Sequence, residues 1–169
     1  MNILVLILRL LHIIGGVFWV GSAVAMNFFV GRTIQSTGDA GKQFVGHLMG
    51  RTNFSQFMSV SSITSVVAGF ILYGIDSSWF TSAWQSSGPG IGFGLGALFA
   101  LVGVVTGIMN GNNNRKMGSL GAQIQGRPTA EQAAQLGAIQ RQQSWIVPVN
   151  MISLLLSLGL MAIARYLQF

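Results

Sequence analysis

Long apolar stretches alternate with short polar ones along the whole chain. A helix needs about 20 mostly apolar residues to cross the hydrocarbon core of a bilayer, and four stretches are long enough. Helices are favoured over a β-barrel because the apolar runs are continuous, whereas barrel strands are short and alternate in polarity. The pattern therefore predicts an all-α membrane protein, a four-helix transmembrane bundle whose spans lie at about residues 3–31, 54–75, 90–109 and 145–167.

The first apolar stretch also has some features of a signal peptide, because it contains the small-residue triplet AVA at residues 23–25. Two features argue against cleavage: no basic residue stands at the extreme N-terminus, and the apolar run continues past the triplet. We therefore expect a retained helix and a single integral membrane domain over residues 1–169.

Composition supports a membrane protein. Hydrophobic residues make up 51% of the chain and charged residues only 7%, whereas a soluble domain has about a quarter charged residues. The net charge of +6 could suggest nucleic acid as a partner, but the basic residues are scattered and mostly flank the apolar runs. The expected partner is thus the lipid bilayer and not nucleic acid. The absence of cysteine excludes disulfides and thiolate metal sites.

The basic residues predict an orientation. Seven of the nine lie in the first and third loops: Arg32, Lys42, Arg51, Arg115, Lys116, Arg127 and Arg141. The second loop, at about residues 76–90, has Asp76 and no basic residue. Because basic loops stay in the cytoplasm, both termini and the second loop are expected on the outer side of a bacterial inner membrane, in a multi-pass arrangement.

Short amphipathic helices are expected in both cytoplasmic loops. Asp39 is a candidate N-cap for one in the first loop. In the third loop Thr129 and Gln132 form a capping-box pattern, and this helix should run directly into the fourth span and bend at Pro148. The polar sequence NGNNNRK, residues 110–116, predicts an exposed turn before it.

Small residues recur at helical spacing in the second and third spans. Helix association in lipid depends on close packing of such residues. The faces comprise Ser61, Ser65 and Gly69 in one span and Gly92, Gly96, Gly103, Gly107 and Gly111 in the other. Two interpretations stay open: the faces pack within the bundle, or one of them docks a second copy or another membrane-protein subunit.

The first span contains a polar face, on which Arg9, His12, Gly16 and Trp19 lie at helical spacing. His12 lies roughly 13 Å from the start of the span at 1.5 Å per residue, too deep to reach water. An imidazole there needs a hydrogen bond or a metal. It is either a structural histidine bonded to a serine, a backbone carbonyl or Gln168 of a neighbouring helix, or an axial ligand to haem iron or a ligand to copper.

A haem site would use the neighbours of this histidine. Gly15 and Gly16 could let a flat ring approach the backbone, and Trp19 could form a wall. Arg9 is one turn further out and could pair with a haem propionate, and Arg165 of the fourth span lies at a similar level.

The second ligand is open. His47 lies in or near the cytoplasmic loop, too far from His12 for one iron to bridge. Met161 lies at nearly the depth of His12, and a thioether suits haem iron or copper(I). A second His12 from another subunit of a dimer is the other route.

The sequence LRLLHIIGGVFWVGSAVAMNFF, residues 8–29, resembles the first helix of the CopD-like superfamily of small bacterial membrane proteins. The resemblance is to a histidine after a leucine, followed by W-x-G, here His12, Trp19 and Gly21. It extends to the last helix, ending in LGLMAIARYL, and is nearest to uncharacterised four-helix members. The resemblance implies a four-helix bundle with His12 facing inward, and in HemJ-type members that histidine is associated with haem. No intramembrane lysine or acidic residue is found here, which argues against the oxidase chemistry of those members.

Three functions remain from the sequence. The first is a haem-b-binding membrane protein, an electron carrier to or from quinone, with His12 as axial ligand. The second is an accessory or structural subunit of a larger membrane complex, and the third is a copper-handling membrane protein. Independent catalysis is not expected, because Asp39, Asp76 and Glu131 all lie in loops and form no carboxylate pair.

Overall fold

A computed structural model describes residues 2–124 and 126–168 of the chain. Among these residues, four helical stretches are long and apolar enough to cross a bilayer, as in a multi-pass membrane protein: Ile3–Thr37, Phe54–Asp76, Gly88–Gln123 and Ala130–Tyr166. The elements are α1 (Ile3–Val24), the π-helix η1 (Ala25–Val30), α2 (Gly31–Thr37), α3 (Asp39–Arg51), α4 (Phe54–Asp76), α5 (Ser82–Gln85), α6 (Gly88–Gln123), α7 (Ala130–Ile163) and the 3-10 helix η2 (Ala164–Tyr166). The prediction of four helices that are long and apolar enough to span a bilayer is therefore confirmed.

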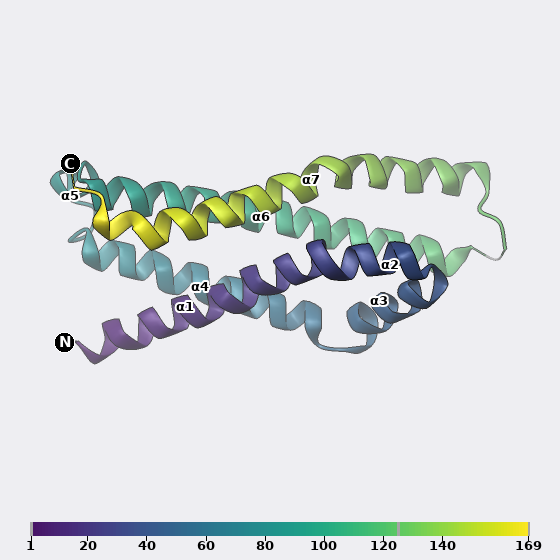
Figure 1. The fold of residues 1–169 in the computed structure, drawn as a ribbon, viewed down its shortest axis with the longest axis horizontal. Coiled ribbons are helices and arrows are strands. Elements are labelled where there is room, and N and C mark those ends of the chain that lie inside the picture. Colours follow the sequence, from purple (N-terminus) through teal and green to yellow (C-terminus); the bar gives the residue numbers. More distant parts are fainter. Residues whose placement is uncertain (1, 125, 169) are drawn as a thin grey trace.

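The helices form two antiparallel pairs, α1 with α4 and α6 with α7, which meet along a smaller contact. Figure 1 shows both chain ends and α5 at one end of the bundle, called here the terminal end. The opposite end contains α2, α3 and the α6–α7 connection, and we call it the basic end because Arg32, Lys42, Arg51, Arg115, Lys116, Arg127 and Arg141 all belong to it. The two basic loops thus share one end, as the orientation argument requires.

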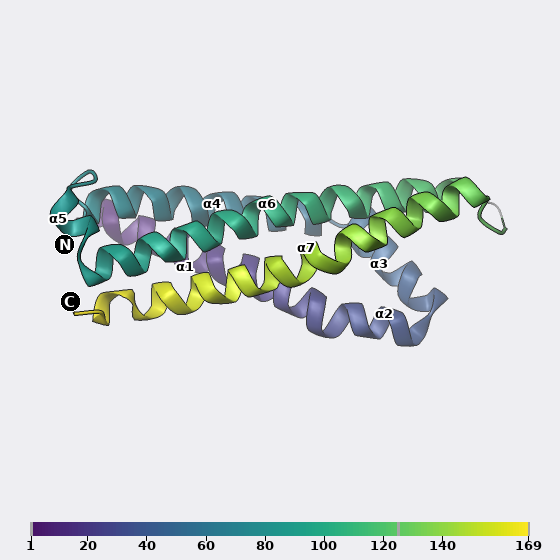
Figure 2. The ribbon, with the colours of Figure 1, turned by 90° about the horizontal axis from the view of Figure 1, so that it is seen from above.

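The third and fourth helices are much longer than their predicted spans. α6 has 36 residues and α7 has 34, which corresponds to about 54 Å and about 51 Å at 1.5 Å per residue. The hydrocarbon core is only about 30 Å thick, so this pair extends well beyond it as a helical hairpin at the basic end. Figure 2 shows the two helices continuing side by side past α2 and α3.

The prediction of an exposed turn at residues 110–116 is wrong, because this stretch lies inside α6. Asparagine is a weak helix former, but a tertiary partner overrides that preference. Here the side-chain Nε2 of Gln143 in α7 donates hydrogen bonds to Oδ1 of Asn110 at 3.1 Å and Oδ1 of Asn114 at 2.7 Å. Asn113 between them is buried. The polar run is therefore part of the α6–α7 interface.

The start of α7 is as predicted. Thr129 is its N-cap, and the capping box with Gln132 has both hydrogen bonds, at 3.0 and 3.2 Å. These bonds satisfy backbone N–H groups that otherwise have no partner at a helix start. The helix then runs without a break into the fourth span and continues through Pro148.

The prediction that Asp39 caps a helix in the first loop is wrong by one position. Gly38 precedes α3 with φ of 59°, a left-handed conformation that glycine adopts without steric cost, and Asp39 is the first helical residue. The side chain of Asp39 accepts a hydrogen bond from Lys42 Nζ at 2.8 Å. This hydrogen bond and the positive charge of Lys42 lower the pKa of the Asp39 carboxyl below its ordinary value.

A π-helical segment separates α1 from α2. A π-helix leaves backbone groups displaced from the regular ladder and needs compensating contacts. Asn27 supplies them, since its Nδ2 donates to the carbonyl of Ala23 at 2.8 Å and to Sδ of Met151 at 3.3 Å. Asn27 therefore links the end of α1 to α7.

Small residues make the close contacts inside both helix pairs. A Cβ added at Gly15 of α1 would lie 2.9 Å from the carbonyl oxygen of Ser61 in α4, and one at Gly92 of α6 would lie 2.9 Å from Cβ of Ala164. Ser65, Gly69, Gly96 and Gly103 are likewise in contact across these two interfaces. The interpretation that these faces pack within the bundle is therefore confirmed for them. Gly111 has open space beside it.

Candidate functional site around His12

His12 lies half-buried on the face of α1 that packs against α4. Its ring nitrogen Nδ1 is 2.8 Å from the carbonyl oxygen of Ser65, and the hydroxyl of Ser65 donates in return to the carbonyl of His12 at 2.9 Å. The ring lies over Gly69, where an added Cβ would approach Nδ1 and Cε1 to 2.7 Å. Ser65 and Gly69 therefore fix both the position and the plane of the imidazole.

The bond to Ser65 also fixes which nitrogen is protonated. A backbone carbonyl can only accept a hydrogen bond, so Nδ1 must donate and must hold the proton. In the neutral ring, Nε2 is then left with a free lone pair. A histidine that binds a metal through Nε2 commonly donates its other N–H to a carbonyl in this way. Of the structural partners considered from the sequence, the backbone carbonyl is confirmed, and the serine hydroxyl of Ser65 also lies 3.4 Å from Nδ1.

Gly15 and Gly16 follow His12 on α1 and, like His12, face α4. A Cβ added at Gly15 would lie 3.2 Å from the backbone nitrogen of Ser65 and also close to Ser61. A Cβ added at Gly16 would lie 3.3 Å from Oγ of Ser65. The close approach that these glycines permit is made by another helix. The structure thus gives them a packing role against α4, and the slot for a flat ring stays a prediction.

Trp19 is buried two turns further along α1, where α1 meets the other helix pair. It packs with Ala23 of α1 and with Met151 and Leu154 of α7. A Cβ added at Gly103 of α6 would lie 3.8 Å from the Trp19 ring. Trp19 therefore contributes to the contact between the helix pairs, and its role as the wall of a haem site stays a prediction.

Two arginines lie at the terminal end. Arg9, one turn outward from His12, is 3.9 Å from a carboxylate oxygen of Asp76 at the end of α4, and both side chains are exposed, at 48% and 39%. An exposed pair of this kind contributes at most about 1 kcal/mol. Arg165 is exposed in η2. Both guanidinium groups are thus accessible to an anionic group at this end.

Met161 and His47 lie apart from the His12 contacts. Met161 belongs to the α6–α7 pair, where its Cγ would lie 2.8 Å from a Cβ added at Gly96. His47 is exposed in α3 at the basic end. Within residues 2–124 and 126–168, no group of three or more His, Asp or Glu side chains is placed to hold a metal ion. The described chain thus offers His12 as a single deep nitrogen donor.

Comparison of this chain with protein-family models, with curated proteins and with solved structures finds no match. The resemblance to the CopD-like superfamily stays a prediction from the sequence.

Three partners of the site were not assigned from the sequence: Ser65, Gly69 and Asp76. Ser65 and Gly69 were visible as members of a small-residue face, and their four-residue spacing puts them on one side of α4. What the sequence does not contain is the register between α1 and α4 that brings this face to His12.

Replacement of Gly69 by alanine tests how His12 is held. The new Cβ would overlap the ring, so we expect the imidazole to leave the Ser65 carbonyl. In ¹⁵N-histidine-labelled protein, the Nδ1 proton should exchange with water at least several-fold faster. Gly21→Ala is the matched control, because nothing lies within 4 Å of its added Cβ. Equal exchange rates in the two variants would contradict this arrangement.

Proposed function

We propose that this chain is an integral membrane protein that binds haem b, with Nε2 of His12 as an axial ligand to the iron. The observation that supports this most directly is the hydrogen bond from Nδ1 of His12 to the Ser65 carbonyl at 2.8 Å. It holds the ring in the tautomer in which Nε2 has a free lone pair, and it does so on the membrane-spanning part of α1.

A single histidine favours haem over a bare metal ion such as copper. A protein site for copper usually needs several nitrogen or sulfur donors, and the other histidine, His47, lies exposed in α3 at the opposite end of the bundle. Haem supplies four nitrogens of its own, so the iron requires only one or two axial ligands from protein. His12 can be one of them, and Met161 or the His12 of a second copy remains the candidate for the other.

Arg9 and Arg165 at the terminal end suit the propionate edge of haem. Haem propionates are carboxylates, and Arg9 is held only by an exposed pair with Asp76. Arg9 and Arg165 would therefore bind the propionates, with no buried ion pair to break. Bound haem would supply one-electron chemistry, and in a membrane an electron carrier to or from quinone is the role we propose.

The proposed location is the bacterial inner membrane, with the basic end in the cytoplasm. Seven basic residues at that end, against Arg9 and Arg165 at the other, support this orientation under the positive-inside rule. Both chain termini would then lie on the outer side.

An accessory subunit of a larger membrane complex is the second candidate. One observation favours it: Gly111, Gly118 and Gly121 of α6 have nothing within 4 Å of an added Cβ. This part of α6 lies toward the basic end, and because glycine has no side chain a partner helix could approach closely there.

The test is the absorption spectrum of protein purified from cells supplied with a haem precursor, before and after addition of haemin. We expect a Soret band in the wild type and in His47→Ala, and its loss in His12→Ala, because the imidazole supplies the bond to iron. His47→Ala is the matched control, since it removes the other histidine of the chain. A wild type that stays colourless after haemin addition contradicts the proposal, and large membrane partners in the same preparation would favour the accessory subunit.

A further inference from the structure

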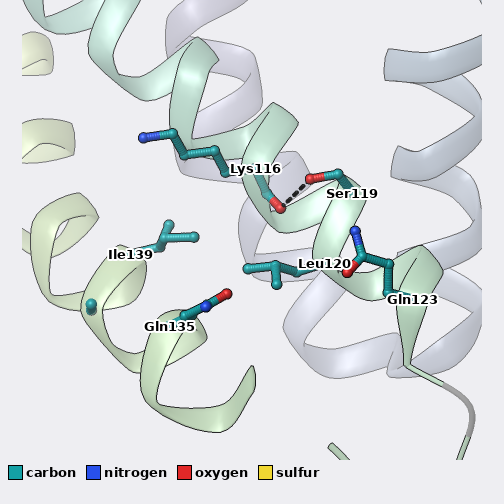
Figure 3. A pocket seen from close by; sticks show the side chains of 7 residues that line it. Lys116, Ser119, Leu120, Gln123, Gln135 and Ile139 are labelled. Carbon is teal, nitrogen blue, oxygen red and sulfur yellow. Dashed lines mark hydrogen bonds between the residues drawn. The ribbon is translucent and has the colours of Figure 1, made fainter. Parts of the chain in front are cut away.

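A groove between α6 and α7 lies on the hairpin that continues past the membrane spans, and its volume is about 470 Å³. Its lining combines apolar and polar side chains from both helices, among them Lys116, Leu120, Gln123, Gln135, Ala138 and Ile139. Figure 3 shows Leu120 and Ile139 pointing toward each other, with the Lys116 side chain extended toward α7. All of the lining residues belong to this helix pair, so no third helix of the described chain closes the groove.

The groove lies in water beyond the lipid headgroups. About 20 helical residues cross the hydrocarbon core, so a span that starts with α6 at Gly88 leaves the core at about residue 108. Lys116 and Gln123 lie about 8 and about 15 residues further along α6, or about 12 to 22 Å at 1.5 Å per residue. The headgroup layer is only about 5 to 8 Å thick on each side. A lipid acyl chain is therefore not placed to fill this groove.

The hairpin that contains the groove is basic. Residues 110–145 include four basic residues and one acidic residue, a surplus of three positive charges: Arg115, Lys116, Arg127 and Arg141 against Glu131. Lys116 is the charged residue that lines the groove, and it is exposed. The two ion pairs found within residues 2–124 and 126–168 do not include it. A group that binds beside this lysine is therefore expected to be acidic.

The shape of the groove fits a third helix. Leu120 is one turn from Lys116 on α6, and Ala138 and Ile139 face them from α7, so the apolar and basic positions form one strip along the pair. An amphipathic helix lays apolar side chains, spaced three and four residues apart, into an apolar groove of this kind. A small anion would use only Lys116, and a purely apolar ligand would leave that charge without a partner.

We propose that this groove binds an acidic amphipathic helix of another protein. Its apolar side chains would lie against Leu120, Ala138 and Ile139, and one of its carboxylates would pair with Lys116. A second copy of this chain does not fit, because copies in one membrane would bring two basic hairpins side by side. The proposal does not rest on haem binding, since the groove and His12 belong to different helix pairs.

The experiment measures peptide binding to the full-length protein in phosphatidylcholine nanodiscs, which have no net charge, by fluorescence anisotropy. The probes are three labelled peptides of about 15 residues, the length at which an isolated helix becomes marginally stable. The first has leucine at helical spacing and glutamate elsewhere, the second has lysine in place of glutamate, and the third is polyglutamate. We expect the first to bind saturably and the others to bind at least about tenfold more weakly, because each lacks either the matching charge or the apolar face.

Two pairs of variants locate the binding. Lys116→Glu should weaken binding of the first peptide by about fivefold to tenfold, because an exposed attraction becomes a repulsion. Arg32→Glu makes the same charge change on α2 and should leave the affinity unchanged, because salt screens distant charges. Ala138→Glu places a carboxylate in the groove and should also weaken binding. Ala133→Glu is its matched control, because Ala133 is an exposed alanine on the opposite side of α7.

Equal binding of the three peptides, no saturable binding of the first, or equal losses in a variant and its control would overturn the proposal. Wild-type dimers that Ala138→Glu dissociates would also overturn it, because a second copy would then occupy the groove. Lys116→Glu should leave the absorption spectrum as in the wild type, so a failure here and a failure of the haem proposal are distinguishable.

Discussion

Valine at Gly15 is expected to separate α1 from α4 and to release His12 from its hydrogen bond. The added Cβ would lie 2.9 Å from the Ser61 carbonyl and 3.2 Å from the backbone nitrogen of Ser65. These are backbone atoms, so the neighbour cannot turn away and the helices must move. Overpacking of this kind costs about 1–3 kcal/mol of unfolding free energy, which unfolding in mixed micelles with increasing SDS can measure.

Gly21→Val is the control for Gly15→Val, because it makes the same change on the same helix where nothing lies within 4 Å. It should leave the unfolding free energy within about 0.5 kcal/mol of wild type. If both variants are equally stable, α1 and α4 are not packed as described here, and the environment of His12 must be different too.

Valine at Gly92 should have a similar effect on the other helix pair without disturbing His12. Its Cβ would lie 2.9 Å from Cβ and 3.0 Å from Cα of Ala164, so α6 and α7 would be forced apart near the terminal end. We expect a loss of about 1–3 kcal/mol by the same measurement. Gly111→Val on the same helix should have almost no effect, because the space beside it is open.

The two valine variants also separate the two helix pairs by their effect on His12. Gly15→Val should accelerate exchange of the Nδ1 proton, whereas Gly92→Val should leave it unchanged. A large effect of Gly92→Val on that proton would contradict the division into pairs that meet along a small contact.

The spans were predictable because the length of an apolar run is a local property of the sequence. The Thr129 capping box was predictable for the same reason, since both of its partners lie within four residues. The stretch at residues 110–116 was not, because its helical state depends on Gln143, about 30 residues away in another helix. The cap of α3 was missed because the N-cap is Gly38, which has a positive φ and precedes the first helical residue, Asp39.

For the candidate site, the sequence identified His12 but not its surroundings. A histidine inside an apolar run is conspicuous, whereas the partner that orients it is the backbone carbonyl of Ser65, which any residue type could supply. The packing contacts of Gly15, Gly16 and Trp19 were not predicted, for one reason. Each was assigned from its place on α1, and the helices that approach α1 could not be placed from spacing within one helix.

The most direct measurement is ¹⁵N NMR of histidine-labelled protein in the His47→Gln variant, where His12 is the only histidine. The structure predicts a ring protonated at Nδ1, and the proposed ligand role predicts a large paramagnetic shift of the Nε2 signal once haemin is added. A ring protonated at Nε2, or signals that haemin leaves unchanged, would contradict the assignment of His12 as the ligand.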